Sequence, residues 1–99
     1  MPKQSASTPT LAVKLAEQQS RLSYNRIPQA GRQAMKRLLL DYLGVALAGS
    51  QSESGVIARE FAAQQGRAAE STLIGGSGRV PMAAAAFANA ISCHSIELD

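Results

Sequence analysis

The stretch Leu38–Ala48 constrains the fold of this chain more than any other feature of the sequence. It reads LLLDYLGVALA, and Asp41 is its one charged residue, whereas the preceding turns carry Arg32, Lys36 and Arg37. A helix that is apolar on all sides must be covered on several sides by other elements. The stretch therefore predicts a bundle of helices, in which Asp41 is buried or half-buried and pairs with Arg37 or with a helix N-terminus.

The sequence predicts two helices up to Gly49, and the second of them contains the stretch Leu38–Ala48. The first follows Thr8 or Thr10, either of which can cap it, and its apolar residues recur at helical spacings, which indicates a surface helix with one buried stripe. These apolar residues are Leu11, Leu15, Ala16 and Leu22. The second helix is capped by Asn25, carries Pro28 in its first turn, where the missing N–H costs nothing, and ends at Gly49.

A third helix is predicted from about Ser52 to Gln65, with Ser52 or Ser54 as its cap. Its helical stripe consists of Val56, Ile57, Glu60, Phe61 and Ala62. Beyond this helix, the segment 71–74 is short and partly β-branched, which predicts a single short strand. The following GGSG allows a tight turn and does not complete a phosphate-binding motif.

The last helix is predicted from about Pro81 through MAAAAFANAISCH, where Ala and Ser leave a slender rod that other helices can approach closely. Phe87 and Ile91, four residues apart, are its expected anchors, and Asn89 needs a hydrogen-bond partner if it is buried. The predicted fold class is therefore all-α, a partial helical bundle of about four helices with one short extended segment.

The first and third helices each offer a single apolar stripe, which is too little to cover the second and fourth. We therefore expect the chain either to associate through a set of large apolar side chains or to keep them as an exposed patch. The set is Leu39, Leu43, Leu47 and Phe87.

Composition narrows the function classes. The 99 residues are 45% hydrophobic and 17% charged, as in globular proteins, and no apolar stretch approaches the roughly 20 residues that span a bilayer. The net charge of +3 is scattered along the chain, which argues against nucleic-acid binding. The single cysteine, Cys93, excludes an internal disulfide and favours a reducing, cytoplasmic location, with a mitochondrial transit peptide as the alternative.

The candidate site is the HSIELD end of the chain, which holds His94, Glu97 and Asp99. If the helix continues, His94 and Glu97 share a face, and if the chain turns extended at Ser95, Glu97 and Asp99 point to one side. Either pair can abstract or deliver a proton. As a zinc site the set has too few ligands. The alternative interpretation is a solvated helix end.

Four pieces of the sequence occur in a characteristic order: RLSYNRIP, MKRLLLDYLGVALAGS, STLIGG and AAAAFANAISCHSIELD. In this order and spacing they resemble the N-terminal portion of the MmgE/PrpD family, which includes 2-methylcitrate dehydratase and cis-aconitate decarboxylase. The resemblance spans residues 11–99. It implies a partial N-terminal helical domain over 11–99, preceded by a flexible tail over 1–10, in a chain that stops as its active-site segment begins.

The resemblance also implies a function. It implies a lyase without metal or other cofactor that abstracts a proton from a small tricarboxylate and then releases water or carbon dioxide, in a cytoplasmic homo-oligomer such as a homodimer. His94 and Asp99 match the family's pattern, and Glu97 stands at an active-site position where the family usually has Asp. The family's remaining catalytic residues lie beyond this stretch, so the chain alone is expected to be inactive. The alternative is a non-catalytic helical module that binds a protein partner, or a truncated gene product.

Overall fold

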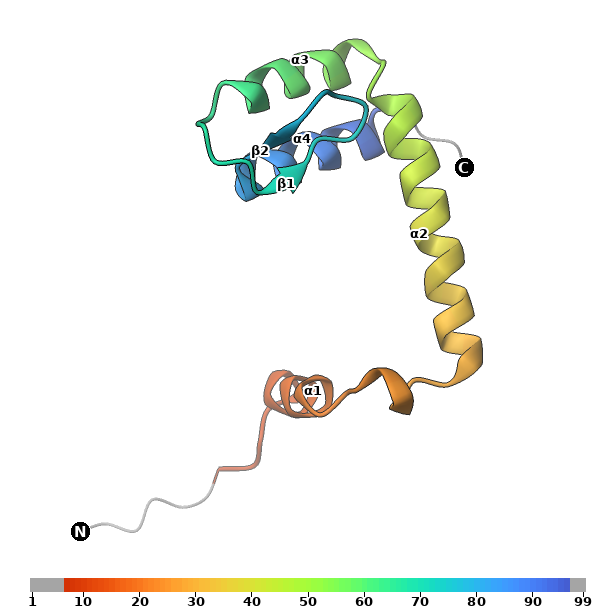
Figure 1. Ribbon diagram of the computed structural model, residues 1–99. Helices are drawn as coiled ribbons and strands as arrows, with labels where there is room; N and C mark the ends of the chain where they lie inside the picture. Colours follow the sequence, from red (N-terminus) through yellow and green to blue (C-terminus); the bar gives the residue numbers. More distant parts are fainter. Residues whose placement is uncertain (1–6, 97–99) are drawn as a thin grey trace, which may run out of the picture. The chain divides into compact units, whose positions relative to one another are not determined.

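The computed structural model describes residues 7–96, and these residues form a mostly helical fold (Figure 1). The described part contains four α-helices, one 3₁₀ helix and one two-stranded sheet, which confirms the predicted fold class. The elements are α1 (Leu11–Ser20), η1 (Tyr24–Arg26), α2 (Gln29–Gly49), α3 (Glu53–Ala63), β1 (Ser71–Thr72), β2 (Arg79–Val80) and α4 (Met82–His94). Met1–Gln33 and Ala34–Asp99 form two separate compact units.

In the first unit, α1 begins where the sequence predicts. The Thr10 hydroxyl accepts a hydrogen bond from the Val13 amide at 3.3 Å, so Thr10 is the cap. Farther along, the guanidinium of Arg32 lies 4.7 Å from the centroid of the Tyr24 ring. The expected buried stripe is not found, because no residue of α1 is buried.

The start of α2 differs from the prediction. Asn25 lies within η1 and does not cap α2, whose first residue, Gln29, follows Pro28. The physical reason is the proline, which disfavours a helical conformation in the preceding residue. Ile27 accordingly is extended, with φ −78° and ψ 122°, and the helical hydrogen bonds begin with the Arg32 amide donating to the Pro28 carbonyl at 3.1 Å.

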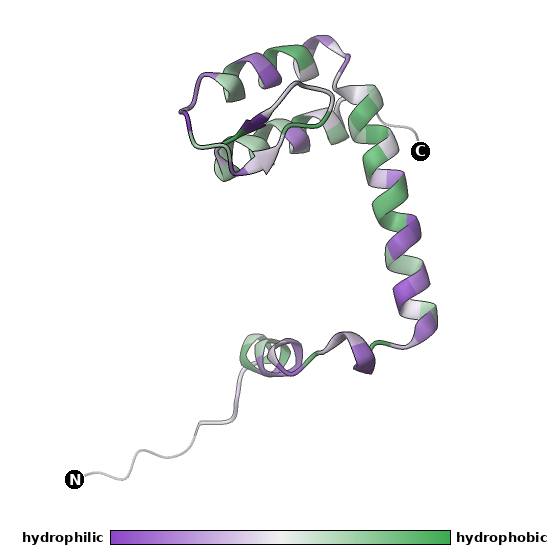
Figure 2. Ribbon diagram, in the orientation of Figure 1, coloured by the Kyte–Doolittle hydropathy of each residue, from purple (hydrophilic) through white to green (hydrophobic). Residues whose placement is uncertain are grey.

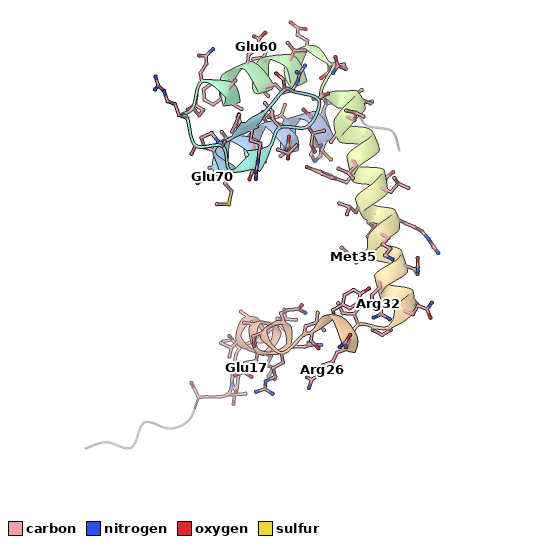
Figure 3. All side chains as sticks on the ribbon, in the orientation of Figure 1. Glu17, Arg26, Arg32, Met35, Glu60 and Glu70 are labelled. Carbon is pink, nitrogen blue, oxygen red and sulfur yellow. The ribbon has the colours of Figure 1, made fainter. Side chains whose placement is uncertain are left out.

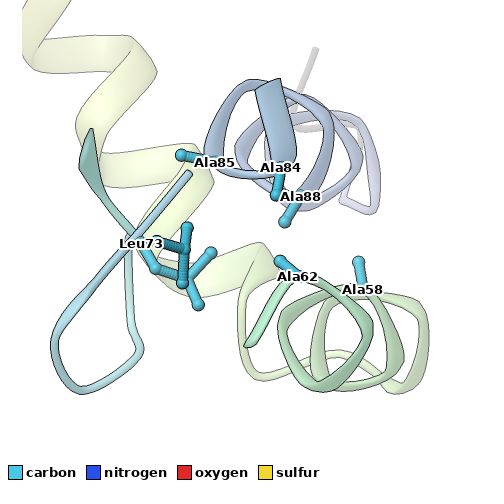
Figure 4. Close-up of a cluster of buried hydrophobic side chains, with 7 residues drawn as sticks. Ala58, Ala62, Leu73, Ala84, Ala85 and Ala88 are labelled. Carbon is cyan, nitrogen blue, oxygen red and sulfur yellow. The ribbon is translucent and has the colours of Figure 1, made fainter. Parts of the chain in front are cut away.

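The second unit has its core between α3, α4 and the small sheet, and this core is made of small side chains (Figure 4). Its buried residues are Ala58, Ala62, Leu73, Val80, Ala84, Ala85 and Ala88. Small residues let the two helix backbones approach closely, as predicted for the alanine-rich α4. Ile91 packs against this cluster, as expected of an anchor.

The expected stripe on α3 is wrong for its two largest members. Ile57 is 59% exposed and Phe61 is 52% exposed, while Ala58 and Ala62 face the core. Phe87 of α4, the other expected anchor, is also half exposed, and its ring meets that of Phe61 edge to face at 5.8 Å. The helix pair therefore buries its alanines and presents its large apolar side chains outward.

The extended segment pairs with a second strand that the sequence does not reveal. β1 and β2 are antiparallel, with Ser71 opposite Val80 and Thr72 opposite Arg79. The chain reverses through the glycine-rich turn, where Gly75 has a φ of 74° that favours glycine.

Two side chains fasten this hairpin to α4. The Asn89 carboxamide accepts a hydrogen bond from the Ile74 amide at 2.9 Å and donates to the Thr72 carbonyl at 3.1 Å, so the half-buried Asn89 has two partners. The carboxylate of Glu70 (labelled in Figure 3) accepts a hydrogen bond from the Met82 amide at 2.8 Å, at the start of α4. α4 is thereby held both by α3 and by the hairpin.

The C-terminal half of α2 is mostly apolar (Figure 2), and its leucines are exposed. Its leucines range from 44% exposed at Leu43 to 73% at Leu40. Leu39, Leu43, Leu47 and Phe87 are each exposed, and the expected association through them stays a prediction. Asp41 is exposed as well, so the prediction of a buried or half-buried carboxylate is wrong, because the surrounding apolar surface is not covered. Among the described residues, no helix is both long enough and apolar enough to cross a membrane.

Candidate active site

His94 is the last residue of α4, and its side chain is exposed. Glu97 and Asp99, the other two predicted site residues, lie outside the described residues. Ser95 follows the helix with φ −69° and ψ −25°, and its amide donates to the Ser92 carbonyl at 3.4 Å. α4 ends at His94, so the alternative of a helix that continues through Ser95 and Ile96 is not found. The alternative of a chain that turns extended at Ser95 is not found either, because the dihedral angles of Ser95 are in the helical region.

The end of α4 is positioned by a junction of three helix ends. A methyl group built on Gly49, the last residue of α2, would lie 1.8 Å from the Ser92 carbonyl oxygen of α4. A methyl group built on Gly55, in the first turn of α3, would lie 2.1 Å from the Gly49 carbonyl oxygen. Both contacts are backbone to backbone, so only glycine fits at these positions. The sequence identifies Gly49 as a helix end, and it gives no sign of these contacts.

Serine side chains satisfy the polar groups of this junction. The Ser52 hydroxyl caps α3 by accepting from the Gly55 amide at 3.1 Å, and it donates to the Gly49 carbonyl at 2.6 Å. Ser54 and Ser95 place their hydroxyl oxygens 2.9 Å apart, which links the start of α3 to the residue after α4. The sequence predicts either Ser52 or Ser54 as the cap of α3, and Ser52 is the residue that caps it. The link to Ser95 spans a separation of 41 residues, for which the sequence carries no signal.

A second anchor ties the hairpin to the same junction. The Arg59 guanidinium donates to the Ser50 carbonyl at 3.1 Å and to the Gly75 carbonyl at 3.0 Å. Ser50 is fully buried, and its hydroxyl donates to the Leu47 carbonyl at 2.7 Å. Arg59 therefore holds the turn between α2 and α3 against the hairpin turn, and it is a structural residue that the sequence analysis missed.

The junction also buries a hydroxyl group without a protein partner. Ser92 is fully buried, and its hydroxyl oxygen has no hydrogen-bond partner among the described residues. Cys93, the next residue, is half-buried and has a free thiol. Among residues 7–96, no three side chains of His, Cys, Asp or Glu lie close enough together to share a metal ion.

An apolar groove of about 370 Å³ lies along the outer side of the α3–α4 pair. Its lining residues are Ser54, Ile57, Ala58, Phe61, Phe87 and Ile91. The groove is almost free of polar groups, so it suits apolar side chains and lacks the groups that would orient a polar substrate. The groove contains none of the predicted site residues, and the assignment of the site to His94, Glu97 and Asp99 stays a prediction.

Comparison with known proteins gives one match. Residues 13–99 match the model of the MmgE/PrpD N-terminal domain, a range that includes all the elements of the second unit and the three predicted site residues. No curated protein and no solved structure matches the chain significantly.

Proposed function

This chain belongs to the MmgE/PrpD family, and from that membership we propose that it is the N-terminal part of a lyase that acts on a small tricarboxylate. Two reactions fit the proposal: dehydration, as in 2-methylcitrate dehydratase, and decarboxylation, as in cis-aconitate decarboxylase. The observation that carries the proposal is the family match over residues 13–99, which extends through the HSIELD segment where proton-handling side chains gather.

Glu97 is the proposed proton-transfer group, and His94 and Asp99 are the other two candidate residues of the segment. In a dehydration, a base takes the proton from the carbon next to a carboxylate, the C–H electrons form the double bond, and the hydroxyl group leaves as water after receiving a proton from an acid. In a decarboxylation, the C–C bond to the departing carboxylate breaks, and the carbanion left behind takes a proton from the acid. Both routes need one side chain that exchanges a proton with a substrate carbon.

The end of α4 suits this role for two reasons. His94 is exposed, so its imidazole is accessible to a substrate. The backbone that carries it is fixed by the Gly49 and Gly55 contacts, and a rigid support is what a proton transfer requires, since a displacement of about 1 Å can lower a rate by about 100-fold. Glutamate at position 97 is one methylene longer than the aspartate that the family usually has there.

The exposed leucines of α2 support a second part of the proposal, a homo-oligomeric enzyme. Covering about 400 Å² of such apolar surface contributes on the order of 10 kcal/mol, which is comparable with the stability of a whole domain. A second copy of the chain, in a complete enzyme, would supply that cover. We place the assembly in the cytoplasm, with a tricarboxylate as its small-molecule partner and without a nucleic-acid partner.

The test uses the protein expressed from its complete reading frame. Turnover of 2-methylcitrate and of cis-aconitate is measured for the wild type and for Glu97→Gln, which keeps the size of the side chain and removes its charge. We expect turnover of one of the two substrates and a loss of about 100-fold to 10,000-fold in kcat for Glu97→Gln. Residues 1–99 expressed alone are expected to show no turnover. Equal activity of Glu97→Gln and the wild type would contradict the assignment.

A second candidate function is favoured by the groove of the α3–α4 pair. Its apolar lining and half-exposed Phe61 and Phe87 fit a non-catalytic helical module that binds a protein partner. The coding DNA after the Asp99 codon separates the two candidates. A frame that continues for several hundred codons supports the lyase, and a stop codon directly after Asp99 supports the module or a truncated gene product.

A further inference from the structure

The positive charge of the chain is concentrated in its first unit, Met1–Gln33. This range contains five of the ten lysines and arginines, and Glu17 is its one acidic residue. The basic residues are Lys3, Lys14, Arg21, Arg26 and Arg32. The first unit thus has a formal charge of +4, whereas the rest of the chain, with five basic and six acidic residues, has −1. The first unit is therefore the part of the chain that attracts anions.

Folding brings three of these cations to one groove between α1 and η1, which we call the α1–η1 groove. It has a volume of about 450 Å³. Its lining residues are Lys14, Glu17, Gln18, Arg21, Leu22 and Arg26, and all six are exposed. Figure 3 labels Glu17 on α1 and Arg26 on η1. With three cations and one carboxylate, the groove has a net charge of +2 and is open to a ligand from solution.

η1 holds Arg26 beside the end of α1. One guanidinium nitrogen of Arg26 donates a hydrogen bond to the Arg21 carbonyl at 3.4 Å. The C-terminal end of a helix attracts cations, which accounts for Arg26 but not for Lys14, two turns earlier. Arg32 has a different environment, because its guanidinium lies over the Tyr24 ring and does not line the groove. The first unit therefore has cations inside the groove and one outside it.

The spacing of the cations indicates the kind of anion that the groove fits. Lys14 and Arg21 are seven residues apart, which corresponds to two turns and about 10 Å along a helix, so they lie on the same side of α1. A compact anion such as phosphate has its charge at one point and meets one or two of these side chains. A molecule with several carboxylates offers a separate partner to each cation, and guanidinium groups match carboxylates in shape.

We propose that the α1–η1 groove is a binding site for a small polycarboxylate, in which Lys14, Arg21 and Arg26 each pair with a carboxylate group. Glu17 opposes this binding by repulsion. The groove contains none of the residues of the proposed lyase reaction, so this is a further site, and its test does not depend on turnover.

The experiment follows the backbone amide resonances of the 99-residue chain while 1,2,3-propanetricarboxylate is added. This probe has no hydroxyl group that could be eliminated. We expect saturable shifts at amides of residues 14–26, with a Kd on the order of 1 mM at low ionic strength. Acetate and inorganic phosphate are expected to bind about fivefold more weakly or less, because neither can pair with three separate cations.

Three substitutions separate a defined site from general attraction by a cationic surface. Arg21→Gln removes a charge from the groove and keeps the backbone carbonyl that Arg26 contacts, and we expect it to raise Kd about threefold to fivefold. Arg32→Gln is the matched control, since it removes the same charge outside the groove, and we expect a change below about twofold. Glu17→Gln is expected to lower Kd by about twofold, because it removes the one carboxylate of the groove.

Three results would overturn the proposal. Equal increases in Kd for Arg21→Gln and Arg32→Gln would show a cationic surface without a defined site. Phosphate that binds as tightly as 1,2,3-propanetricarboxylate would show that the groove does not select several carboxylates. A titration without saturable shifts at residues 14–26 would show that the groove binds no polycarboxylate.

Discussion

The α3–α4 pair and α2 use apolar side chains in opposite ways. In the pair, alanines fill the interface and the large side chains of Ile57, Phe61 and Phe87 stay half exposed or more. In α2, the leucines are exposed along most of the apolar half, and the close contacts with α4 and α3 are made by Gly49 at its end. Small residues bring helices of this chain together, and large ones are presented outward.

This difference separates two roles within one unit. The alanine core is complete within the chain, since α3, α4 and the hairpin cover it, and it fixes the end of α4 that carries His94. The leucines of α2 are not covered by α3, α4 or the hairpin and are exposed. The contrast predicts that substitutions at the junction or in the core reduce stability, whereas substitutions on α2 act on association.

The largest expected effect comes from a pair of glycines on α2. Gly49→Ala places a methyl group 1.8 Å from the Ser92 carbonyl oxygen, and we expect it to lower the free energy of unfolding by about 3 kcal/mol. Gly44→Ala meets nothing within 4 Å, and we expect it to raise that free energy by about 0.5–1 kcal/mol through helix propensity. Urea unfolding of both variants of the 99-residue chain measures the difference. If both substitutions changed the free energy of unfolding in the same direction, the contrast between the C-terminal end of α2 and its middle would be wrong.

A smaller effect is expected from enlarging the core. Ala88 is fully buried between α3 and α4, so Ala88→Leu should cost about 2 kcal/mol by forcing the two helices apart. Leu43→Ala on α2 is the control, because this side chain is already 44% exposed, and we expect a change below about 0.5 kcal/mol in the monomer. Thermal unfolding at low protein concentration compares them. A larger loss for Leu43→Ala than for Ala88→Leu would mean that α2 belongs to the core.

The hairpin anchor gives the smallest of these effects. Asn89→Ala leaves the Ile74 amide and the Thr72 carbonyl without their partner, and we expect a loss of about 1–2 kcal/mol. The control on α2 is Asp41→Ala, where the carboxylate is exposed and a change within about 0.5 kcal/mol is expected. Amide exchange at Ile74 should accelerate in Asn89→Ala only. Equal stability of the two variants would show that Asn89 does not hold the hairpin.

Capping and breaking residues predict the helices well, because they act locally. Thr10, Ser52 and Pro81 mark the starts of α1, α3 and α4 close to where the structure has them. Asn25 misleads because Pro28 keeps Ile27 extended, which delays the start of α2. The sequence does not predict β2, because a two-residue strand is too short to show an alternating pattern.

The buried faces are harder to predict than the helices, because burial depends on which elements pack together. Helical spacing places Ile57 and Phe61 in the expected apolar stripe of α3. In the structure, α4 packs on Ala58 and Ala62 instead. The candidate site shows the same limit. The sequence identifies His94, Glu97 and Asp99 by residue type, whereas the Ser54–Ser95 hydrogen bond and the Gly49 contact depend on tertiary packing.

Amide hydrogen exchange at several protein concentrations tests the contrast between the two regions most directly. We predict that amides of α3 and α4 around Ala62 and Ala88 exchange slowly at every concentration, because their core is complete within the chain. We predict that amides of the stretch 38–47 in α2 exchange faster in the dilute protein and become slower as the concentration rises, because association covers their leucines. Protection of α2 that equals that of α3 and α4 and does not change with concentration would contradict this account.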